Sequence, residues 1–340
     1  MLKLKALTRR AEFAAFVGSV VVFLFFLYAG WPTFATVGIT ASWINVAAEL
    51  GIVALPIALI MIAGHLDLSV GANIAASGMM YALLGGHFGL PDAIALPAGL
   101  LTGTFFGFLN GVIVTKVKLS AFIVTLAMSF FVRGVIFGAT KLLVNNVQVA
   151  HEAEPWVTDS IGGKLVDQFN NTIVLFVLVA AVVSWLMYRS TFGNWVWAIG
   201  GDEQSARAAG VPVERTTIAL FTGSGFGAAL LGVTSVAVYG SAQVSAGQDK
   251  VFYTIIAVVI GGVLLTGGYG SPVGVIFGTL TFAIVTTGIN ATQFDKDWNQ
   301  LIIGVLVLAA VLANNFYRKL ALTGEKPAVT AKAPGKKGSK

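Results

Sequence analysis

Long apolar runs alternate with short polar segments along most of this chain. A helix needs about 20 mainly apolar residues to cross the hydrocarbon core of a bilayer. On that basis the pattern predicts about ten transmembrane helices, at Phe13–Ala29, Trp43–Ala63, Val70–Gly85, Ala93–Thr115, Ala121–Ala139, Thr172–Tyr188, Thr217–Tyr239, Tyr253–Leu265, Val273–Ile289 and Leu301–Phe316. The runs Val70–Gly85 and Tyr253–Leu265 are short for a full crossing, and glycine-bordered helices of this kind often stop part-way. The predicted fold is an all-α, polytopic membrane protein.

The composition agrees with this interpretation. Of the 340 residues, 56% are hydrophobic and 11% are charged, whereas roughly a quarter of a soluble domain is charged. We therefore treat residues 1–318 as a single transmembrane domain. Residues 319–340 contain Pro, Gly and Lys with few apolar side chains, which predicts a disordered basic tail.

The distribution of Lys and Arg predicts the orientation. When the N-terminus is placed inside, sixteen of the 21 basic residues fall in cytoplasmic segments, four fall outside, and Arg133 lies within a span. This asymmetry follows the positive-inside rule and places both termini in the cytoplasm. The net charge of +6 is concentrated at the chain ends, as in a membrane anchor, so we expect contact with lipid and no nucleic-acid partner.

The sequence offers little for catalysis. It has no cysteine, so disulfides and thiolate metal sites are excluded. It has no Gly-x-x-x-x-Gly-Lys-Ser/Thr segment, and its three histidines are not at metal-ligand spacing. We predict that the chain is not an enzyme and carries neither a metal nor a cofactor of its own.

A polar island, Gly200–Val213, interrupts the apolar pattern on the predicted cytoplasmic side. Asp202 is a plausible N-cap with Glu203 in the first turn, and Gly210 followed by Pro212 ends the helix. The resulting helix has roughly two turns, too few for stability alone in water. Its exposed side is expected to carry small side chains, those of Ala206, Ala208 and Ala209. This shape suits docking into a groove of another protein, and the alternative is an ordinary solvated loop.

Uncharged polar residues within the spans are candidates for a solute pathway. Asn73 and Ser77 share one helix face through their i, i+4 spacing, and Thr125 and Ser129 share another. Asn110 and Asn290 lie near span ends. Hydroxyl and amide groups suit a neutral, hydrogen-bonding solute that must also be released. The alternative is that they bond neighbouring helices to each other.

Charged groups in the spans are few, and charge in lipid is costly. Glu49 is a candidate for binding a proton or coupling ion, although it lies near a span end. Asp67 or Ser69 is expected to cap the helix that starts at Val70, with a pathway role as the alternative.

Glycines repeat at four-residue spacing, which allows helices to approach closely. Gly103, Gly107 and Gly111 share one face, and three further pairs repeat the pattern, namely Gly134/Gly138, Gly223/Gly227 and Gly274/Gly278. We expect a tightly packed bundle.

Several of these segments together resemble a known family, the ribose/xylose/arabinose-type permeases of bacterial ABC importers. Five motifs occur in the family's order: Leu66–Gly71 (LDLSVG), the coupling loop at Gly200–Val213, Ser241–Gln243 (SAQ), Ala257–Gly262 (AVVIGG) and Gly267–Ser271 (GGYGS). Toward the C-terminal end of the likeness, Trp298–Gly304 is also similar. The likeness covers roughly Trp43 to Arg318.

The resemblance implies a multi-pass permease of the bacterial inner membrane that imports a monosaccharide or related polyol. It implies a cytoplasmic ABC ATPase, an extracytoplasmic sugar-binding protein, and a second permease subunit, either identical or different. It also assigns contact with the ATPase to the short cytoplasmic helix, at Gly201, Asp202, Glu203, Ala206, Arg207 and Gly210. The alternative function is an ion-coupled secondary transporter of a small neutral solute.

Overall fold

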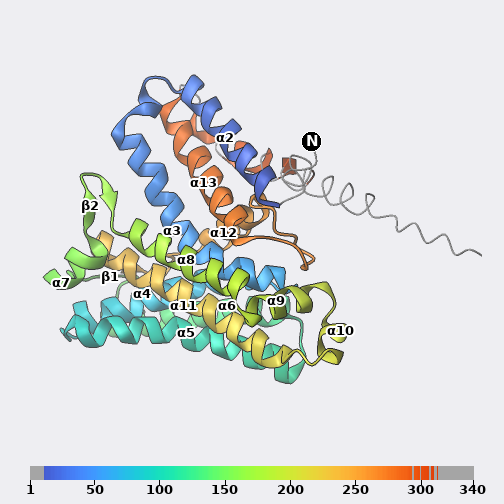
Figure 1. Cartoon of the computed structure of the whole chain (residues 1–340). Helices are drawn as coiled ribbons and strands as arrows, with labels where there is room; N and C mark the ends of the chain where they lie inside the picture. The colour runs from blue at the N-terminus through green and yellow to red at the C-terminus, as the bar shows by residue number, and fades with distance from the viewer. Residues whose placement is uncertain (1–10, 293–294, 299, 306–307, 310–311, 313–340) are drawn as a thin grey trace, which may run out of the picture.

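The computed structural model describes residues 11–292, 295–298, 300–305, 308–309 and 312 (Figure 1). The basic N-terminal residues, the predicted tail 319–340 and much of the predicted last span, Leu301–Phe316, lie outside these described residues. Both predicted cytoplasmic termini therefore stay predictions.

The described chain is mainly helical, with four very short strands. Its longer helices are α2 (Ala11–Ala29), α3 (Val37–Ile62), α4 (Val70–Ala82), α5 (Asp92–Val117), α6 (Ala121–Val144), α8 (Thr172–Arg189), α9 (Thr191–Gly201), α11 (Val213–Tyr239), α12 (Lys250–Ile260) and α13 (Pro272–Gly288). The six-residue helix α10 (Glu203–Ala208) joins α9 to α11. Short helical turns and the strands β1 to β4 lie between these helices; they are η1 (Thr33–Ala35), η2 (Leu83–His87), β1 (Gln148–Ala150), α7 (Pro155–Val157), η3 (Thr158–Gly162), β2 (Lys164–Val166), β3 (Phe169–Asn170), β4 (Ser241–Gln243), η4 (Ile289–Ala291) and η5 (Lys296–Trp298).

Seven helices in the described chain are long and apolar enough to cross a membrane. They are α2, α3, α5, α6, α8, α11, and α13 together with η4. The two runs that were predicted to be short are short: α4 has 13 residues before it continues into the π-helical turn η2, and α12 has 11 residues. Every predicted span before residue 290 contains a helix, although Tyr253–Leu265 extends beyond the end of α12 at Ile260. The polytopic all-α fold is confirmed, while the number of crossings stays a prediction.

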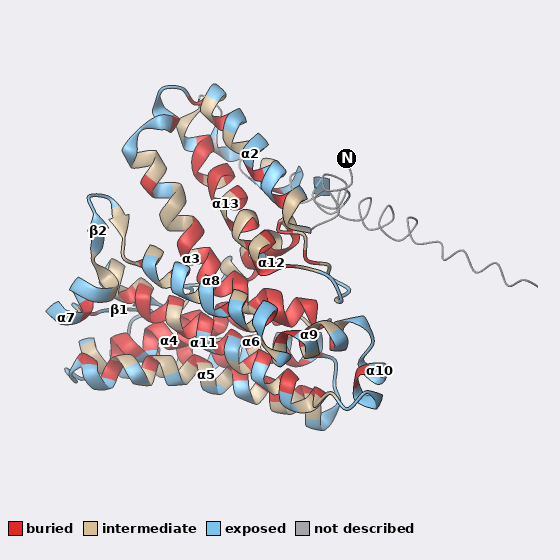
Figure 2. Ribbon diagram, in the orientation of Figure 1, coloured by how far each residue is buried: buried red, intermediate tan, exposed pale blue. Residues whose placement is uncertain are grey.

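Two helices, α3 and α11, form the centre of the bundle, and the buried residues concentrate on them, on α4 and on α13 (Figure 2). Helix α11 packs against α5, α4 and α3, whereas α13 packs against α3, α2 and α12. The outer faces of α2, α6 and α8 present large exposed apolar side chains, such as Phe25, Phe130 and Trp185. In a bilayer these faces suit contact with lipid, because lipid tails are as apolar as the side chains themselves.

Close packing of α5 on α11 depends on glycine, as predicted for Gly103, Gly107 and Gly111. A Cβ atom added at Gly107 would lie 2.8 Å from the Cα of Gly225, so the two backbones touch. The same prediction is wrong for Gly134, Gly138 and Gly223, because no described atom lies within 4 Å of a Cβ built there. Four-residue spacing shows which glycines share a face, and it does not show which face meets another helix.

A small β-ladder ties two distant segments together after the ends of α6 and α11. Strand β1 (Gln148–Ala150) pairs antiparallel with β4 (Ser241–Gln243), with Val149 opposite Ala242. The backbone N–H of His151 then donates to the carbonyl of Gly240. These bonds hold the chain that follows α6 beside the chain that follows α11.

Two interruptions of helix lie against each other. Residues 63–69 separate α3 from α4, and residues 261–271 separate α12 from α13. The N–H of Gly268, in the second interruption, donates to the carbonyl of Ile62 at the end of α3 over 2.8 Å. Irregular backbone at membrane depth must find its hydrogen bonds within the protein, and this bond is one of them.

Candidate functional site

A buried carboxylate, that of Asp67, anchors a polar cluster between α4, α5 and α11. Its Oδ1 accepts hydrogen bonds from the N–H and the hydroxyl of Ser69, at 2.9 and 2.6 Å. Its Oδ2 accepts a bond from the hydroxyl of Ser224 on α11 at 2.8 Å. All three residues are fully or almost fully buried. The expectation that Asp67 or Ser69 caps the helix that starts at Val70 is wrong, because Ser69 occupies the N-cap position but its side chain accepts no N–H of α4. Asp67 instead bonds to Ser69, the residue that directly precedes α4, and so holds the turn before the helix.

The hydroxyl of Ser69 joins two of the predicted pathway residues to this carboxylate. It accepts a bond from the amide of Asn110 on α5 at 2.7 Å and a longer one from the amide of Asn73 at 3.3 Å. Because the single hydroxyl proton of Ser69 is directed to Asp67, both amides approach Ser69 as donors. The cluster is therefore a directed chain of donors that ends on one carboxylate and joins α4, α5 and α11.

Three oxygen atoms of the pathway candidates are buried without a hydrogen-bond partner among the described residues. They are Asn73 Oδ1, Asn110 Oδ1 and Ser77 Oγ. A buried polar atom without a partner is costly, so a passing solute hydroxyl or an ordered water would bind favourably there. Asn73 and Asn110 belong to the Asp67 network, whereas Ser77 lies against α5, where a Cβ atom added at Gly103 would be 2.5 Å from its hydroxyl oxygen.

The other pathway candidates differ in their surroundings. Thr125 on α6 is fully buried, accepts the N–H of Leu68 at 3.1 Å and donates to the carbonyl of Ala121. It therefore borders the interruption before α4. Ser129 is also buried, but its hydroxyl donates to Leu126 of its own helix. Asn290 is exposed beyond the end of α13 and lies apart from the cluster.

Sequence reasoning missed Ser224, which supplies the bond between the cluster and α11. The local signal is weak, since a serine between two glycines in a span has many possible partners. The role of Ser224 depends on tertiary structure, because the packing of α11 on α5 and α4 brings it to Asp67, 157 residues away in the sequence.

The short helix α10 forms as the sequence predicts. Asp202 Oδ1 accepts the N–H of Ser205 at 2.7 Å, so Asp202 is the N-cap. These hydrogen bonds from Ser205 hold the pKa of the Asp202 carboxyl below its ordinary value. At the other end, the N–H of Val211 donates to Ala206 and that of Gly210 to Arg207, with Gly210 at a φ of +84°. This arrangement is a Schellman motif, which explains why the helix stops at a glycine.

One expectation for α10 is wrong. Ala206 is not on the exposed side, because it is buried at 5% exposure and packs in the main hydrophobic core. Ala208 and Ala209 are exposed, as expected. The two-turn length made the face ambiguous from sequence, and the return of the chain through Val211 and Val213 covers Ala206. The face open to a partner is therefore formed by Glu203, Gln204, Arg207 and Ala208.

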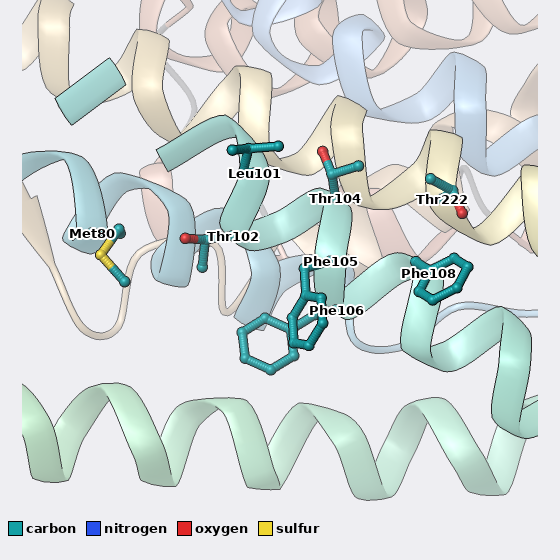
Figure 3. A pocket seen from close by; sticks show the side chains of 8 residues that line it. All are labelled: Met80, Leu101, Thr102, Thr104, Phe105, Phe106, Phe108 and Thr222. Carbon is teal, nitrogen blue, oxygen red and sulfur yellow. The ribbon is translucent and has the colours of Figure 1, made fainter. Parts of the chain in front are cut away.

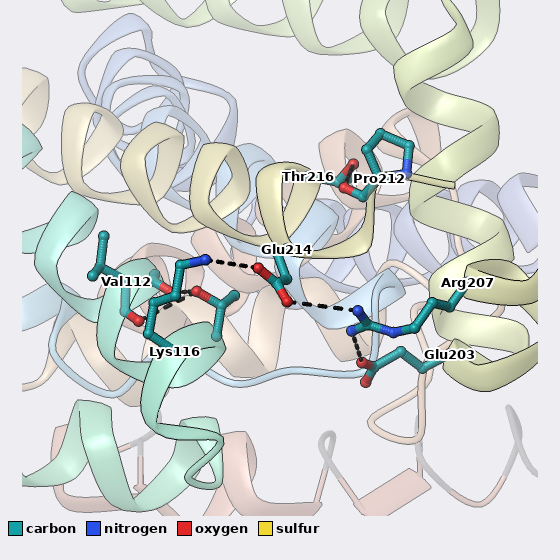
Figure 4. A network of polar contacts seen from close by, with 9 residues as sticks. Val112, Lys116, Glu203, Arg207, Pro212, Glu214 and Thr216 are labelled. Atoms are coloured by element: carbon teal, nitrogen blue, oxygen red, sulfur yellow. Dashed lines mark hydrogen bonds and ion pairs between the residues drawn. The ribbon is translucent and has the colours of Figure 1, made fainter. Parts of the chain in front are cut away.

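Charged side chains connect α10 to the ends of α5 and α11 (Figure 4). Arg207 pairs with Glu203 at 3.3 Å and with Glu214 at 3.6 Å, and Glu214 also pairs with Lys116 at 2.9 Å. All four side chains are at least one-third exposed, and exposed ion pairs contribute little stability. These ion pairs orient α10 relative to α5 and α11, while most of the free energy that holds α10 in place must come from other contacts.

An open groove of about 650 Å³ lies along α5 and is lined by apolar groups (Figure 3). Phe105, Phe106 and Phe108 contribute to it, together with Met80, Leu101, Thr102, Thr104 and Thr222. The hydroxyls of the three threonines donate to carbonyls of their own helices, which leaves their methyl groups for the groove. None of the predicted pathway residues lines it.

The candidate for ion coupling, Glu49, has a partner in the structure. Its carboxylate pairs with Lys250 at 3.0 Å and also accepts the hydroxyl of Tyr239. A carboxylate whose charge is already compensated is poorly suited to bind a coupling cation.

Comparison with known proteins gives a consistent result. Residues 39–311 match the sequence model of a family described as the permease component of branched-chain amino acid transport systems. The chain is 32% identical over 285 residues to a fructose import permease protein of Rhizobium meliloti, which covers 81% of this chain and 77% of that protein. It is 32% identical over 298 residues to an inner membrane ABC transporter permease protein of Escherichia coli (strain K12), covering 86% and 88% of the two chains. A ribose import permease protein of the same strain is 31% identical over 285 residues, covering 84% and 88%.

Proposed function

Because the chain belongs to the family of permease components of branched-chain amino acid transport systems, we propose that it is the membrane-spanning subunit of an ATP-driven importer for a monosaccharide or related polyol. The observation that carries this proposal is α10, a capped helix with an exposed face, inserted between α9 and α11 of a family permease. As a permease the chain is a transport component, and its multi-pass inner-membrane location is confirmed by its apolar helices and its relatives.

The proposed mechanism is alternating access driven by a separate ATPase. Closure of the ATPase on ATP would move α10, which is joined to α9 through Asp202 and to α11 through residues 209–212. Glu203, Arg207 and Ala208 would contact the ATPase, while Asp202 and Gly210 fix the two ends of the helix. A second permease subunit, identical or different, would complete the membrane part, and an extracytoplasmic sugar-binding protein would deliver the solute.

The substrate class follows from the polar cluster. The family description mentions branched-chain amino acids, whereas the relatives named for a substrate import fructose and ribose. A zwitterionic amino acid needs a partner for each charge, and the carboxylate of Asp67 is already bonded to serines. The unpaired oxygens of Asn73, Ser77 and Asn110 instead suit the hydroxyl donors of a neutral polyol.

An ion-coupled secondary transporter remains the alternative, and no described residue favours it specifically. Its best candidate, Glu49, is paired with Lys250. The docking helix α10 would also have no role in a transporter that acts alone.

The test is co-purification of the permease with a two-P-loop ATPase encoded beside it, followed by hydrolysis assays in proteoliposomes. We expect a stable complex whose ATP hydrolysis rises when a ribose- or fructose-loaded binding protein is added, and not when leucine and its binding protein are added. A permease that purifies alone and accumulates solute under an ion gradient would contradict the proposal. If only leucine with its binding protein stimulated ATP hydrolysis, the chain would still be the permease of an ATP-driven importer, but a sugar would be rejected as its substrate.

A further inference from the structure

The end of α9 meets both helix interruptions at a junction of backbone atoms. A Cβ atom added at Gly200 would overlap the carbonyl oxygen of Ile62, at the end of α3, and would lie 2.6 Å from the nitrogen of Gly268. Those two atoms are themselves joined by the hydrogen bond from Gly268 to Ile62. Gly200 therefore lies directly against the bond that holds one interruption to the other.

Other glycines complete this junction from the opposite side. A Cβ at Gly267 would lie 2.7 Å from the Cα of Gly64 and 3.2 Å from the carbonyl oxygen of Gly200. Gly64, Gly267 and Gly268 all have positive φ angles, of +85°, +79° and +75°. A side chain is thus excluded at Gly267 for two separate reasons, space and backbone conformation.

The junction is connected to α10 without a linker. Gly201 ends α9, Asp202 is the N-cap of α10, and the N–H of Asp202 still donates to Ala198 of α9. Near the start of α13, Tyr188 donates to the hydroxyl of Ser271, which in turn accepts the N–H of Gly274. A displacement of α10 consequently reaches residues 63–69 and 261–271 through backbone contacts that have no side-chain rotamer to absorb it.

We propose that Gly200 is a positioning residue that transmits the movement of α10 to both helix interruptions, and hence to the Asp67 cluster that follows the first. The exposed pairs of Arg207, Glu214 and Lys116 are the competing route, but solvent screens them. The proposal rests on the proposed function, since it needs a partner that moves α10.

The decisive variant is Gly200→Ala, studied in the complete complex with its ATPase in proteoliposomes. We expect the ATPase to co-purify and to hydrolyse ATP at its basal rate, while stimulation by the loaded binding protein and solute uptake each fall at least about tenfold. Gly223→Ala is the matched control, because it makes the same change in a helix where no described atom lies within 4 Å of the new Cβ. Uptake within twofold of wild type in Gly200→Ala would overturn the proposal, as would loss of ATPase binding by an inserted variant.

A second measurement does not depend on the folding of that variant. The chain has no cysteine, so spin labels can be attached at Ala209→Cys, directly after α10 and outside its partner-facing residues, and at Leu265→Cys in the second interruption, both exposed. We expect their separation to stay constant between the nucleotide-free and vanadate-trapped complexes, while the separation from Ala209→Cys to Leu142→Cys at the far end of α6 changes. Independent movement of positions 209 and 265 would refute the proposed junction. If the wild-type permease bound no ATPase, the proposed function itself would be rejected. Co-purification of the wild type shows this before either experiment is done.

Discussion

Replacing Ser224 with alanine removes the hydrogen bond that Asp67 Oδ2 accepts at 2.8 Å, and no other described residue donates to that oxygen. The carboxylate stays buried at 1% exposure, so water cannot replace the lost donor without reorganisation. Hydrogen bonds to charged groups contribute about 1.5–3 kcal/mol, whereas interhelical bonds measured in a membrane protein average about 0.6 kcal/mol with a maximum of about 1.7.

The acceptor is a fully buried carboxyl oxygen, which places this bond at the upper end of the membrane range. We therefore expect Ser224→Ala to lower the free energy of unfolding by about 1.5–1.7 kcal/mol, or roughly 10- to 20-fold in the unfolding equilibrium constant. The measurement is reversible unfolding in mixed micelles with a rising fraction of denaturing detergent, followed by circular dichroism.

A matched control lies on the same helix. Ser235 on α11 is partly buried and does not bond to Asp67 in the described part of the chain, so Ser235→Ala should change the free energy of unfolding by less than about 0.5 kcal/mol. In an Asp67→Ala background, Ser224→Ala should lose most of its effect, because the partner is gone. An equal effect of Ser224→Ala in both backgrounds would refute the assignment of this bond.

Three further outcomes are expected. Ala208→Trp should abolish ATPase co-purification without preventing insertion, whereas Val117→Trp at the exposed end of α5 should not; retained binding by the first variant would reject α10 as the docking helix. The pKa of the Asp202 carboxyl is lower in the folded state than its ordinary value of 3.8. The stability that this cap contributes is therefore complete above pH 3.8 and is lost as the pH falls through the lower pKa of the folded state. A spin label at Gln204→Cys should therefore become mobile only in acid, and Asp202→Asn, which caps without titrating, should abolish that step. Glu49→Gln should leave uptake insensitive to imposed ion gradients, and a change in gradient dependence would favour the secondary transporter.

The sequence predicted most helices because the bilayer imposes a simple rule on length and polarity. It also predicted both ends of α10, since Asp202 and Gly210 act through bonds within a few residues of themselves. It did not predict α9, whose apolar residues Thr191–Gly201 follow α8 directly and resemble a continuation of the span. A cap at Ser190, which accepts the N–H of Gly193, separates the two helices.

The candidate site was less predictable because its contacts are distant in sequence. Spacing placed Asn73 and Ser77 on one face, and both are buried, but spacing contains no information on Ser224 or on which amide meets Ser69. The same limit explains the error at Ala206, whose burial depends on how the chain returns after Gly210. The pathway roles of these residues, including Ser129 and Asn290, stay predictions.

The order of synthesis gives the Asp67 cluster one more consequence. Asn110 is made 41 residues after Ser69, and Ser224 is made 157 residues after Asp67. At about 5–20 residues per second, the ribosome delivers the last donor roughly 8–30 s after the carboxyl. A carboxyl group in lipid is costly throughout that interval. We therefore expect the nascent α3–α4 segment to stay beside the protein-lined exit of the insertion machinery until α11 emerges, so that release of this segment into the bilayer is a late step in biogenesis.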